Sequence, residues 1–307
     1  MLSLVQGIFS TIVLVEFILG QFANSFIALV NFIGWVKRHK ISLVDGILTA
    51  LAVSRIGLLC VILIHLWLLV CNPVLHKLDL RAILIAWMVT NHFSMCLATC
   101  LSMFYLLKIA SFSSLIFLHL KWRVERAVLM ILFGSLVFLG SELAMVNTND
   151  RIWMSIYERN KTLKAELSGS ISLPHLIAFT LANFIPFTTS LTSLLLLIFS
   201  MWKHLKKMQL NGKGSQDPST KAHIKAMQTV ISFLLLFAIY FLCLIISVWS
   251  SNEQKTVVLC QTIGMVYPSS HSFVLIFVNQ KLKEVFLSVL RQLRERFWLK
   301  GRKLSTS

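Results

Sequence analysis

Seven long apolar runs separated by short polar stretches dominate the sequence. They span residues 7–34, 43–70, 83–107, 127–146, 176–200, 227–250 and 257–279. About 20 apolar residues in a helix are enough to cross the roughly 30 Å hydrocarbon core of a bilayer. Unpaired backbone groups are very costly in lipid, and the alternating pattern of a membrane barrel is missing, so each run is expected to be a helix. The sequence predicts an all-α membrane protein with a bundle of seven transmembrane helices.

The composition supports this class and one undivided bundle. Hydrophobic residues make up 57% of the 307 residues and charged residues 13%, against about 25% charged in soluble proteins. The first run has no basic segment before it and continues to Ile33, which is too long for the core of a cleaved signal peptide. We expect one seven-helix transmembrane domain at 1–279 and a basic tail at 280–307.

The distribution of lysine and arginine predicts the orientation. Basic residues concentrate after the first, third and fifth runs and in the tail, and include Lys37, Arg38, Lys40, Lys108, Lys121, Arg123, Arg126, Lys203, Lys206, Lys207, Lys281 and Lys283. Such loops face the cytoplasm, which places the N-terminus outside and the C-terminus inside. The net charge of +17 then suits the anionic lipids of the inner leaflet, and we expect no nucleic-acid partner.

Two further features agree with this topology. Asn160 begins the glycosylation acceptor Asn-Lys-Thr in a loop that the charge distribution places outside. In the tail, apolar residues at Leu282, Val285, Phe286, Val289, Leu290 and Leu293 alternate with basic ones. This pattern predicts a short amphipathic C-terminal helix along the inner leaflet.

The motifs exclude several classes of function. The sequence has no HExxH, GxSxG or phosphate-binding loop, so we expect no enzyme activity, catalytic residue, metal site or cofactor. An odd number of runs without a visible repeat argues against inverted-repeat transporters. A small-solute transporter or channel is the alternative, but a conduction path needs polar residues at every level and the middles of the runs are mostly Leu, Ile, Val and Phe. A receptor is favoured.

Longer stretches carry a specific resemblance. They are "ILTALAVSRIGLL" from Ile47, "TNHFS" from Thr90, "FYLLKIASFSSLIFLHLKWRV" from Phe104, the stretch from Pro186 to Leu236, and "YPSSHSFVLIFVNQKLK" from Tyr267. Over essentially its whole length the chain resembles the type 2 (bitter) taste receptors, a branch of the G-protein-coupled receptors. The third run lacks Asp-Arg-Tyr and the seventh lacks Asn-Pro-x-x-Tyr, as in that family. Gln21 and Cys96 depart from the family pattern.

This resemblance implies a plasma-membrane receptor for small bitter compounds that activates a heterotrimeric G protein of the gustducin or inhibitory type. At the inner ends of the runs, it implies a G-protein face that includes Tyr105, Lys108, His119, His204, Lys207 and His223. The basic side chains among these could instead serve the membrane, because a basic rim attracts lipid headgroups as well as an acidic partner. The punctuated stretch at 212–223 would permit movement between the fifth and sixth runs.

Arg55 lies well inside the second run. A charge at bilayer depth costs at least ~2.5 kcal/mol and is expected to find partners inside the bundle. The nearest expected partners are Asn24 in the first run and Ser269, Ser270 or Ser272 in the seventh. Whether this group is a static tie between helices or a latch whose partners change on activation stays open, although the family places the arginine in the network beneath its ligand pocket.

A ligand site is predicted in the outer half. Trp87, Asn91 and Ser94 share one helix face and suit a small, mostly apolar ligand. Alternatively, Trp87 lies in the interfacial belt and Asn91 bonds another helix. The resemblance implies that these residues line the pocket together with Tyr240, Gln261 and Tyr267. Because position 261 is glutamine, and the nearest candidate acid is Glu16, we expect neutral agonists to be favoured over strongly basic ones.

Overall fold

The computed structural model describes residues 2–38, 41–71, 73–110, 112, 114–159, 173–210, 218–250 and 253–304. Asn160 lies outside these residues. The helices are α1 (Leu2–Arg38), α2 (Leu43–Cys71), α3 (Pro73–Ile109), α4 (Leu115–Trp122), α5 (Val124–Arg159), α7 (Leu173–Leu210), α8 (Pro218–Trp249), α9 (Gln254–Val278) and α10 (Gln280–Leu304).

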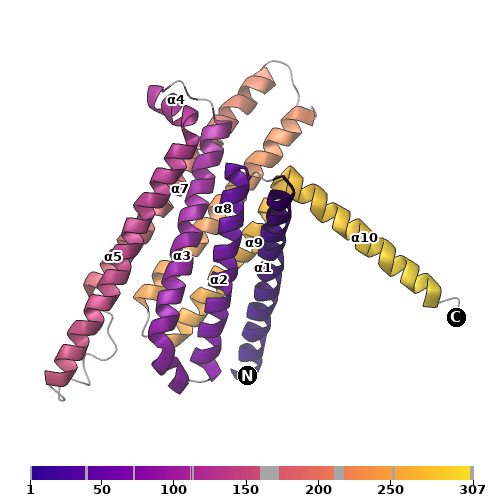
Figure 1. The fold of residues 1–307 in the computed structure, drawn as a ribbon. Coiled ribbons are helices and arrows are strands. Elements are labelled where there is room, and N and C mark those ends of the chain that lie inside the picture. The colour runs from indigo at the N-terminus through magenta and orange to yellow at the C-terminus, as the bar shows by residue number, and fades with distance from the viewer. Residues whose placement is uncertain are drawn as a thin grey trace.

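Seven long helices, α1, α2, α3, α5, α7, α8 and α9, run side by side as a bundle, with the short α4 at one end and α10 extending away from that end (Figure 1). Helix α3 packs against α2, α5 and α7, whereas α9 packs against α1, α2 and α8. These two helices therefore bring both halves of the chain together in the interior. The predicted all-α seven-helix bundle is confirmed.

Six of the described helices are long and apolar enough to cross a membrane. Helix α9 is the seventh of the bundle and is not among these six; it carries the polar residues Gln261, Ser269, His271 and Ser272 in its middle. Three of these four side chains are buried. Helix α9 therefore turns these polar groups toward neighbouring helices. Their presence in this helix is explained by those contacts, because the polar side chains do not face lipid.

The helices extend beyond the apolar runs from which they were predicted. Helix α5 continues to Arg159, past the end of the fourth run at residue 146, and α8 begins at Pro218, before the sixth run at residue 227. An apolar run marks only the part of a helix that must lie in hydrocarbon, and the backbone remains free to continue as a helix in water. Helix α4 was not predicted, because eight residues between two runs give little periodicity.

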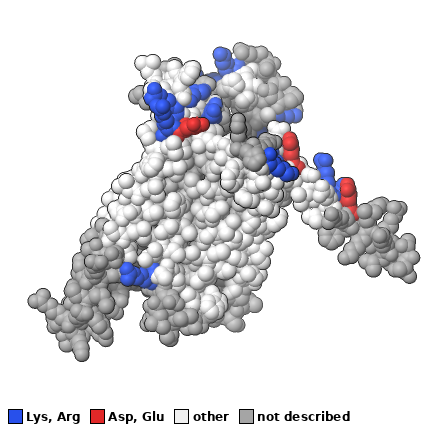
Figure 2. Space-filling view, viewed as in Figure 1, with Lys and Arg blue, Asp and Glu red and all other residues white. Residues whose placement is uncertain are grey.

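Large apolar side chains face outward along the bundle. Phe133 and Val137 of α5 are 69% and 74% exposed, while Leu58 and Leu59 of α2 are fully buried. Exposed apolar surface on this scale would be a liability in water, but it suits contact with lipid. On the face shown in Figure 2, the described Lys and Arg residues gather mainly at the end of the bundle that carries α4 and the start of α10, and a broad uncharged belt lies below this end. This distribution agrees with the orientation predicted from the sequence.

Helix α10 is anchored at its first turns. Leu282 is fully buried, and the Phe286 ring meets the Phe26 ring of α1 edge to face at 5.4 Å. Lys281 Nζ lies 3.0 Å from Asp45 Oδ2 of α2 and donates to Asn31 Oδ1 of α1 at 2.9 Å. Farther along, Val289, Leu290 and Leu293 are 41%, 46% and 45% exposed, so this part of the apolar face is available to lipid.

Candidate functional site

Arg55 lies at the centre of a polar network inside the bundle. Its side chain is fully buried, and Nη1 donates a hydrogen bond to Ser272 Oγ at 3.2 Å. The guanidinium carbon lies 4.7 Å from the centroid of the Tyr267 ring, within the range of a cation–π contact. Helix α2 therefore presents its one mid-span charge to α9, through one polar and one aromatic partner.

Ser272 extends this network to α1. Its hydroxyl donates to Asn24 Oδ1 at 2.7 Å, and Asn24 Nδ2 donates to the carbonyl of Pro268 at 3.2 Å. Ser270 is differently placed, because its hydroxyl donates to the carbonyl of Val266 on its own helix. The network thus joins α1, α2 and α9 through Asn24, Arg55 and Ser272.

A glycine permits α1 and α9 to approach this closely. A Cβ atom at Gly20 would lie 2.5 Å from Ser269 Oγ and 2.6 Å from Leu59 Cδ1, closer than packed atoms allow. Because the helices are this close, Ser269 Oγ of α9 donates a hydrogen bond to the carbonyl of Glu16 of α1 at 3.0 Å. This hydrogen bond, which is separate from the one between Ser272 and Asn24, therefore depends on the absence of a side chain at residue 20.

A second cluster lies in the outer half of the bundle. The Tyr240 hydroxyl of α8 donates to Asn91 Oδ1 of α3, and Asn91 Nδ2 donates to Asn183 Oδ1 of α7 at 3.3 Å. Above Asn91 on α3, Trp87 stacks on Phe179 of α7 with centroids 5.6 Å apart. We call these five residues the outer cluster, and it joins α3, α7 and α8.

Tyr267 connects the outer cluster to the Arg55 network. Its ring lies 5.0 Å from the Tyr240 ring and 4.7 Å from the Arg55 guanidinium carbon, centroid to atom. The Tyr267 ring also stacks on the His271 ring, with centroids 5.4 Å apart. A continuous series of contacts therefore runs from Trp87 to Arg55, and its members in order are Phe179, Asn183, Asn91, Tyr240 and Tyr267.

The two other residues predicted for the ligand site lie differently. Ser94 is fully buried on the same helix as Asn91. Gln261 of α9 is partly buried, and its Oε1 accepts a hydrogen bond from His65 Nδ1 of α2 at 2.9 Å. Gln261 therefore faces α2, and its carbonyl oxygen is engaged by His65.

Sequence reasoning missed several residues that the fold places at this site. Phe179 and Asn183 are one helical turn apart and contact Trp87 and Asn91, which repeat the same spacing on α3. That matching spacing was the signal from which the two residues could have been found. Sequence reasoning also missed Glu142 of α5, whose side chain is only 7% exposed, although an isolated carboxylate in an apolar run is itself unusual.

The residues predicted for the G-protein face gather at one end of the bundle. Lys108 at the end of α3, His119 of α4 and Lys207 of α7 are exposed, and Tyr105 is half-buried. The rings of His204 in α7 and His223 in α8 meet at 4.9 Å between centroids. Their contact joins the inner ends of α7 and α8.

A seven-helix membrane bundle in which polar contacts connect an outer cluster to an interior network has the architecture of a membrane receptor. The chain belongs to the taste receptor type 2 family, whose model, "Taste receptor protein (TAS2R)", matches residues 1–294. It is a bitter taste receptor and a multi-pass protein of the plasma membrane.

Individual relatives agree over the full length. Taste receptor type 2 member 20 is 56% identical over 310 residues in Homo sapiens and in Pan paniscus, with 100% of both chains covered. Taste receptor type 2 member 46 of Homo sapiens is 55% identical over 311 residues, again with 100% of both chains covered. The resemblance recognised in the sequence is confirmed, because these matches span every transmembrane helix.

Proposed function

We propose that the outer cluster binds small, mostly apolar bitter agonists and that the inner face activates a heterotrimeric G protein of the gustducin or inhibitory type. The observation that carries this proposal is the bond between Tyr240 of α8 and Asn91 of α3. It lies beside the aromatic pair Trp87 and Phe179, so an agonist that stacks on the rings also reaches a polar pair that joins two helices.

The agonist acts by taking over one partner of this pair. A ligand acceptor or donor that bonds Asn91 competes with the Tyr240 hydroxyl, and a neutral hydrogen bond of this kind contributes only about 1 kcal/mol net. Release of Tyr240 changes its contact with Tyr267, whose ring covers Arg55. Agonist binding is thereby coupled to the network that joins α1, α2 and α9.

At the inner end, the same rearrangement separates α7 from α8. Their inner ends meet through His204 and His223, and Pro186 interrupts the hydrogen bonding within α7 nearer the outer cluster. A proline inside a helix removes one backbone bond and so favours bending there. Opening between the two helices would expose Tyr105, Lys108, His119 and Lys207 to the G protein.

The composition of the outer cluster supports neutral agonists. Trp87 and Phe179 offer aromatic area, while Asn91, Asn183 and Tyr240 offer uncharged donors and acceptors. Gln261, at the outer part of α9, also lacks charge, and His65 holds its carbonyl oxygen. A strongly basic ligand would have no carboxylate partner among these residues.

The test is ligand-dependent nucleotide exchange on gustducin and on an inhibitory G protein, in membranes from cells that express the chain. A panel of chemically diverse bitter compounds supplies the agonists, and surface labelling verifies delivery. We expect at least one neutral aromatic compound to stimulate exchange. Failure of the whole panel on both G proteins, despite good surface delivery, would contradict the proposed coupling.

A matched pair of variants tests the location of the agonist. Trp87→Phe shrinks a ring of the outer cluster, whereas Trp67→Phe makes the same change on α2 at a side chain that is 56% exposed. We expect Trp87→Phe to lower agonist potency severalfold and Trp67→Phe to leave it unchanged. Equal effects of the two substitutions would place the agonist elsewhere.

A further inference from the structure

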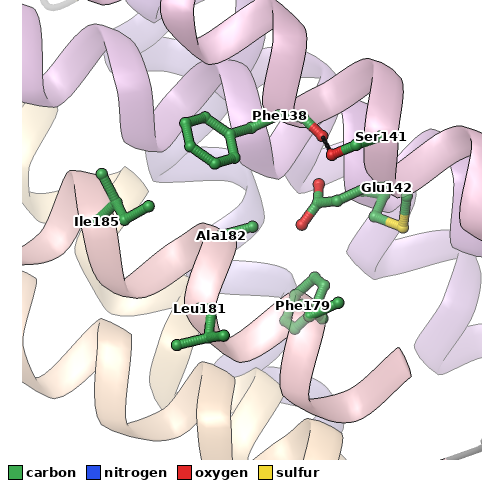
Figure 3. Close-up of a pocket in the computed structure, with 9 residues that line it drawn as sticks. Phe138, Ser141, Glu142, Phe179, Leu181, Ala182 and Ile185 are labelled. Atoms are coloured by element: carbon green, nitrogen blue, oxygen red, sulfur yellow. Dashed lines mark hydrogen bonds between the residues drawn. The ribbon is translucent and has the colours of Figure 1, made fainter. Parts of the chain in front are cut away.

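A cavity opens between α5 and α7 beside the outer cluster, with which it shares Phe179 (Figure 3). Its volume is about 200 Å³, and it is lined by Met88, Phe138, Ser141, Glu142, Ala178, Phe179, Leu181, Ala182 and Ile185. Most of these side chains are apolar, and one is a carboxylate. The lining therefore combines an apolar body with a single charged group, as small-ligand sites commonly do.

The cavity opens toward lipid. Phe138, Leu181 and Ile185 are 41%, 57% and 45% exposed on helix faces that cross the uncharged belt of the bundle. At the inner side of the cavity, Met88 and Phe179 are buried. A ligand dissolved in the bilayer could therefore enter between α5 and α7 without passing through the outer end of the receptor.

Within the described part of the chain, Glu142 lines this cavity with one unpaired carboxylate oxygen. Its side chain is 7% exposed, and Oε1 is buried with no hydrogen-bond partner among the described residues. Figure 3 shows the carboxyl group pointing into the space between Phe179 and Ala182. A carboxylate inside a membrane normally pairs with another group or lines a functional path, so the missing partner indicates a ligand.

No basic side chain is among the described residues that line the cavity: α3 contributes Met88, and the α7 residues are all apolar. The nearest imidazole farther along α3, that of His92, contacts Cys96 at 3.5 Å between Nε2 and Sγ. Ala182 lies four residues before Pro186, which has no N–H to donate to its carbonyl. The cavity is therefore richer in hydrogen-bond acceptors than in donors.

We propose that this cavity binds lipid-soluble amines, with the ammonium group paired to Glu142 and the apolar body against Phe138, Leu181 and Ile185. An ammonium group supplies the charge and the donors that the cavity lacks, and a charge-assisted hydrogen bond is about twice as strong as a neutral one. Basic amphiphiles thus reach this receptor from the membrane, at a site distinct from the one for neutral agonists.

Ligand at this site acts on the outer cluster through a shared wall. Phe179 lines the cavity and also stacks on Trp87 at 5.6 Å, and its carbonyl accepts a hydrogen bond from Asn183 Nδ2 at 2.9 Å. An amine that shifts Phe179 therefore changes both the aromatic surface and the amide seen by an agonist. The second site modulates the response to neutral agonists.

The experiment is photolabelling of the full chain in lipid vesicles, which does not depend on G-protein coupling. The probes are a dodecylamine with a diazirine near the chain end and the matching dodecanol. Mass spectrometry then maps the labelled peptides. We expect the amine, and not the alcohol, to label peptides from the α5 and α7 cavity, and unlabelled dodecylamine to compete while dodecanol does not.

Variants assign the selectivity to the carboxylate. Glu142→Gln keeps the size and polarity of the side chain, and amine labelling of the cavity should fall at least about tenfold, or ~1.4 kcal/mol. The matched control Glu253→Gln removes an exposed carboxylate at the start of α9 and should leave labelling unchanged. Ala182→Phe fills the cavity and should abolish amine labelling there while Glu142 is intact.

The comparison of amine and alcohol labelling is made in the wild-type chain, so its result does not depend on whether a variant folds. Equal labelling of the cavity by amine and alcohol would overturn the proposal and indicate a groove for neutral lipid chains. Amine labelling that persists in Glu142→Gln would overturn it as well. Loss of labelling only in Glu142→Gln and Ala182→Phe, with Glu253→Gln unaffected, is the result that the proposal requires.

Discussion

Arg55 carries its charge in the middle of the bundle on few polar contacts. It donates to Ser272 and lies over the Tyr267 ring, while Nε and Nη2 have no hydrogen-bond partner among the residues described. A guanidinium with unmet donors is poorly suited to a purely static tie, because buried donors cost free energy when left unpaired. We therefore favour a latch whose partners change on activation.

Arg55→Leu should give a receptor that reaches the surface poorly or signals weakly, with the contacts of the outer cluster unchanged. Loss of a hydrogen bond to a charged group, about 1.5–3 kcal/mol, corresponds to a potency loss of at least about tenfold. Arg55→Lys keeps the charge but not the planar donors, and should restore delivery more than signalling. Dose responses with surface labelling measure both. Normal delivery together with an unchanged dose response would refute the role.

Gln261 tests the choice of neutral agonists. Glutamic acid at this position would offer a charge to cationic ligands, but His65 Nδ1 lies 2.9 Å from the present Oε1 and would compete for it. We expect Gln261→Glu to shift preference toward a cationic agonist only modestly, and the double variant with His65→Leu to shift it by about tenfold, or ~1.4 kcal/mol.

The measurement is a parallel dose response to one cationic and one neutral agonist in the wild type, both single variants and the double variant. His65→Leu alone is the control, because it removes the competitor without adding a charge. Potency ratios that are the same in all four receptors would show that residue 261 does not face the ligand.

At the scale of the helices, the sequence predicts existence and order better than extent and contact. Lipid forces each apolar run to be a helix, so all seven were recognised. The continuation of α5 to Arg159 lies outside that rule. Which side chains meet depends on how each helix is rotated and tilted against its neighbours, so the bond from Tyr240 to Asn91 could not be derived, and Asn183 was missed.

The junction of α7 and α8 makes a prediction about motion. The ring centroids of His204 and His223 are 4.9 Å apart, so a short, reducible bifunctional thiol reagent is expected to span cysteines at these positions. If activation separates the two inner ends, crosslinking the double variant His204→Cys with His223→Cys by this reagent in membranes should suppress agonist-dependent nucleotide exchange. Reduction should restore it.

Each single cysteine variant is the control, since it carries the same loss of one imidazole and cannot form the crosslink. The extent of crosslinking is measured by proteolysis between α7 and α8 followed by electrophoresis. Full exchange activity in a fully crosslinked receptor would mean that the inner ends of α7 and α8 stay together during activation.

At the scale of the whole molecule, the separation of charge fixes how the receptor lies in the membrane. On the face shown in Figure 2, the described Lys and Arg residues gather mainly at the end where α4 lies and α10 begins, and this end faces the cytoplasm under the positive-inside rule. The ion pair of Lys281 with Asp45 and its hydrogen bond to Asn31 hold the start of α10 at the same end. The opposite end of the bundle, where α5 ends and α7 begins, is then on the outside.

This orientation predicts a glycan on Asn160, which lies between α5 and α7 in an Asn-Lys-Thr acceptor. Treatment of the expressed receptor with an N-glycosidase should increase its mobility on a gel, and Asn160→Gln should have the mobility of the treated wild type. Thr162→Ala is the matched control, because it removes the acceptor motif and keeps the asparagine. An unchanged mobility would show that the site is unused, and a tag between α5 and α7 that proves cytoplasmic would reverse the whole topology.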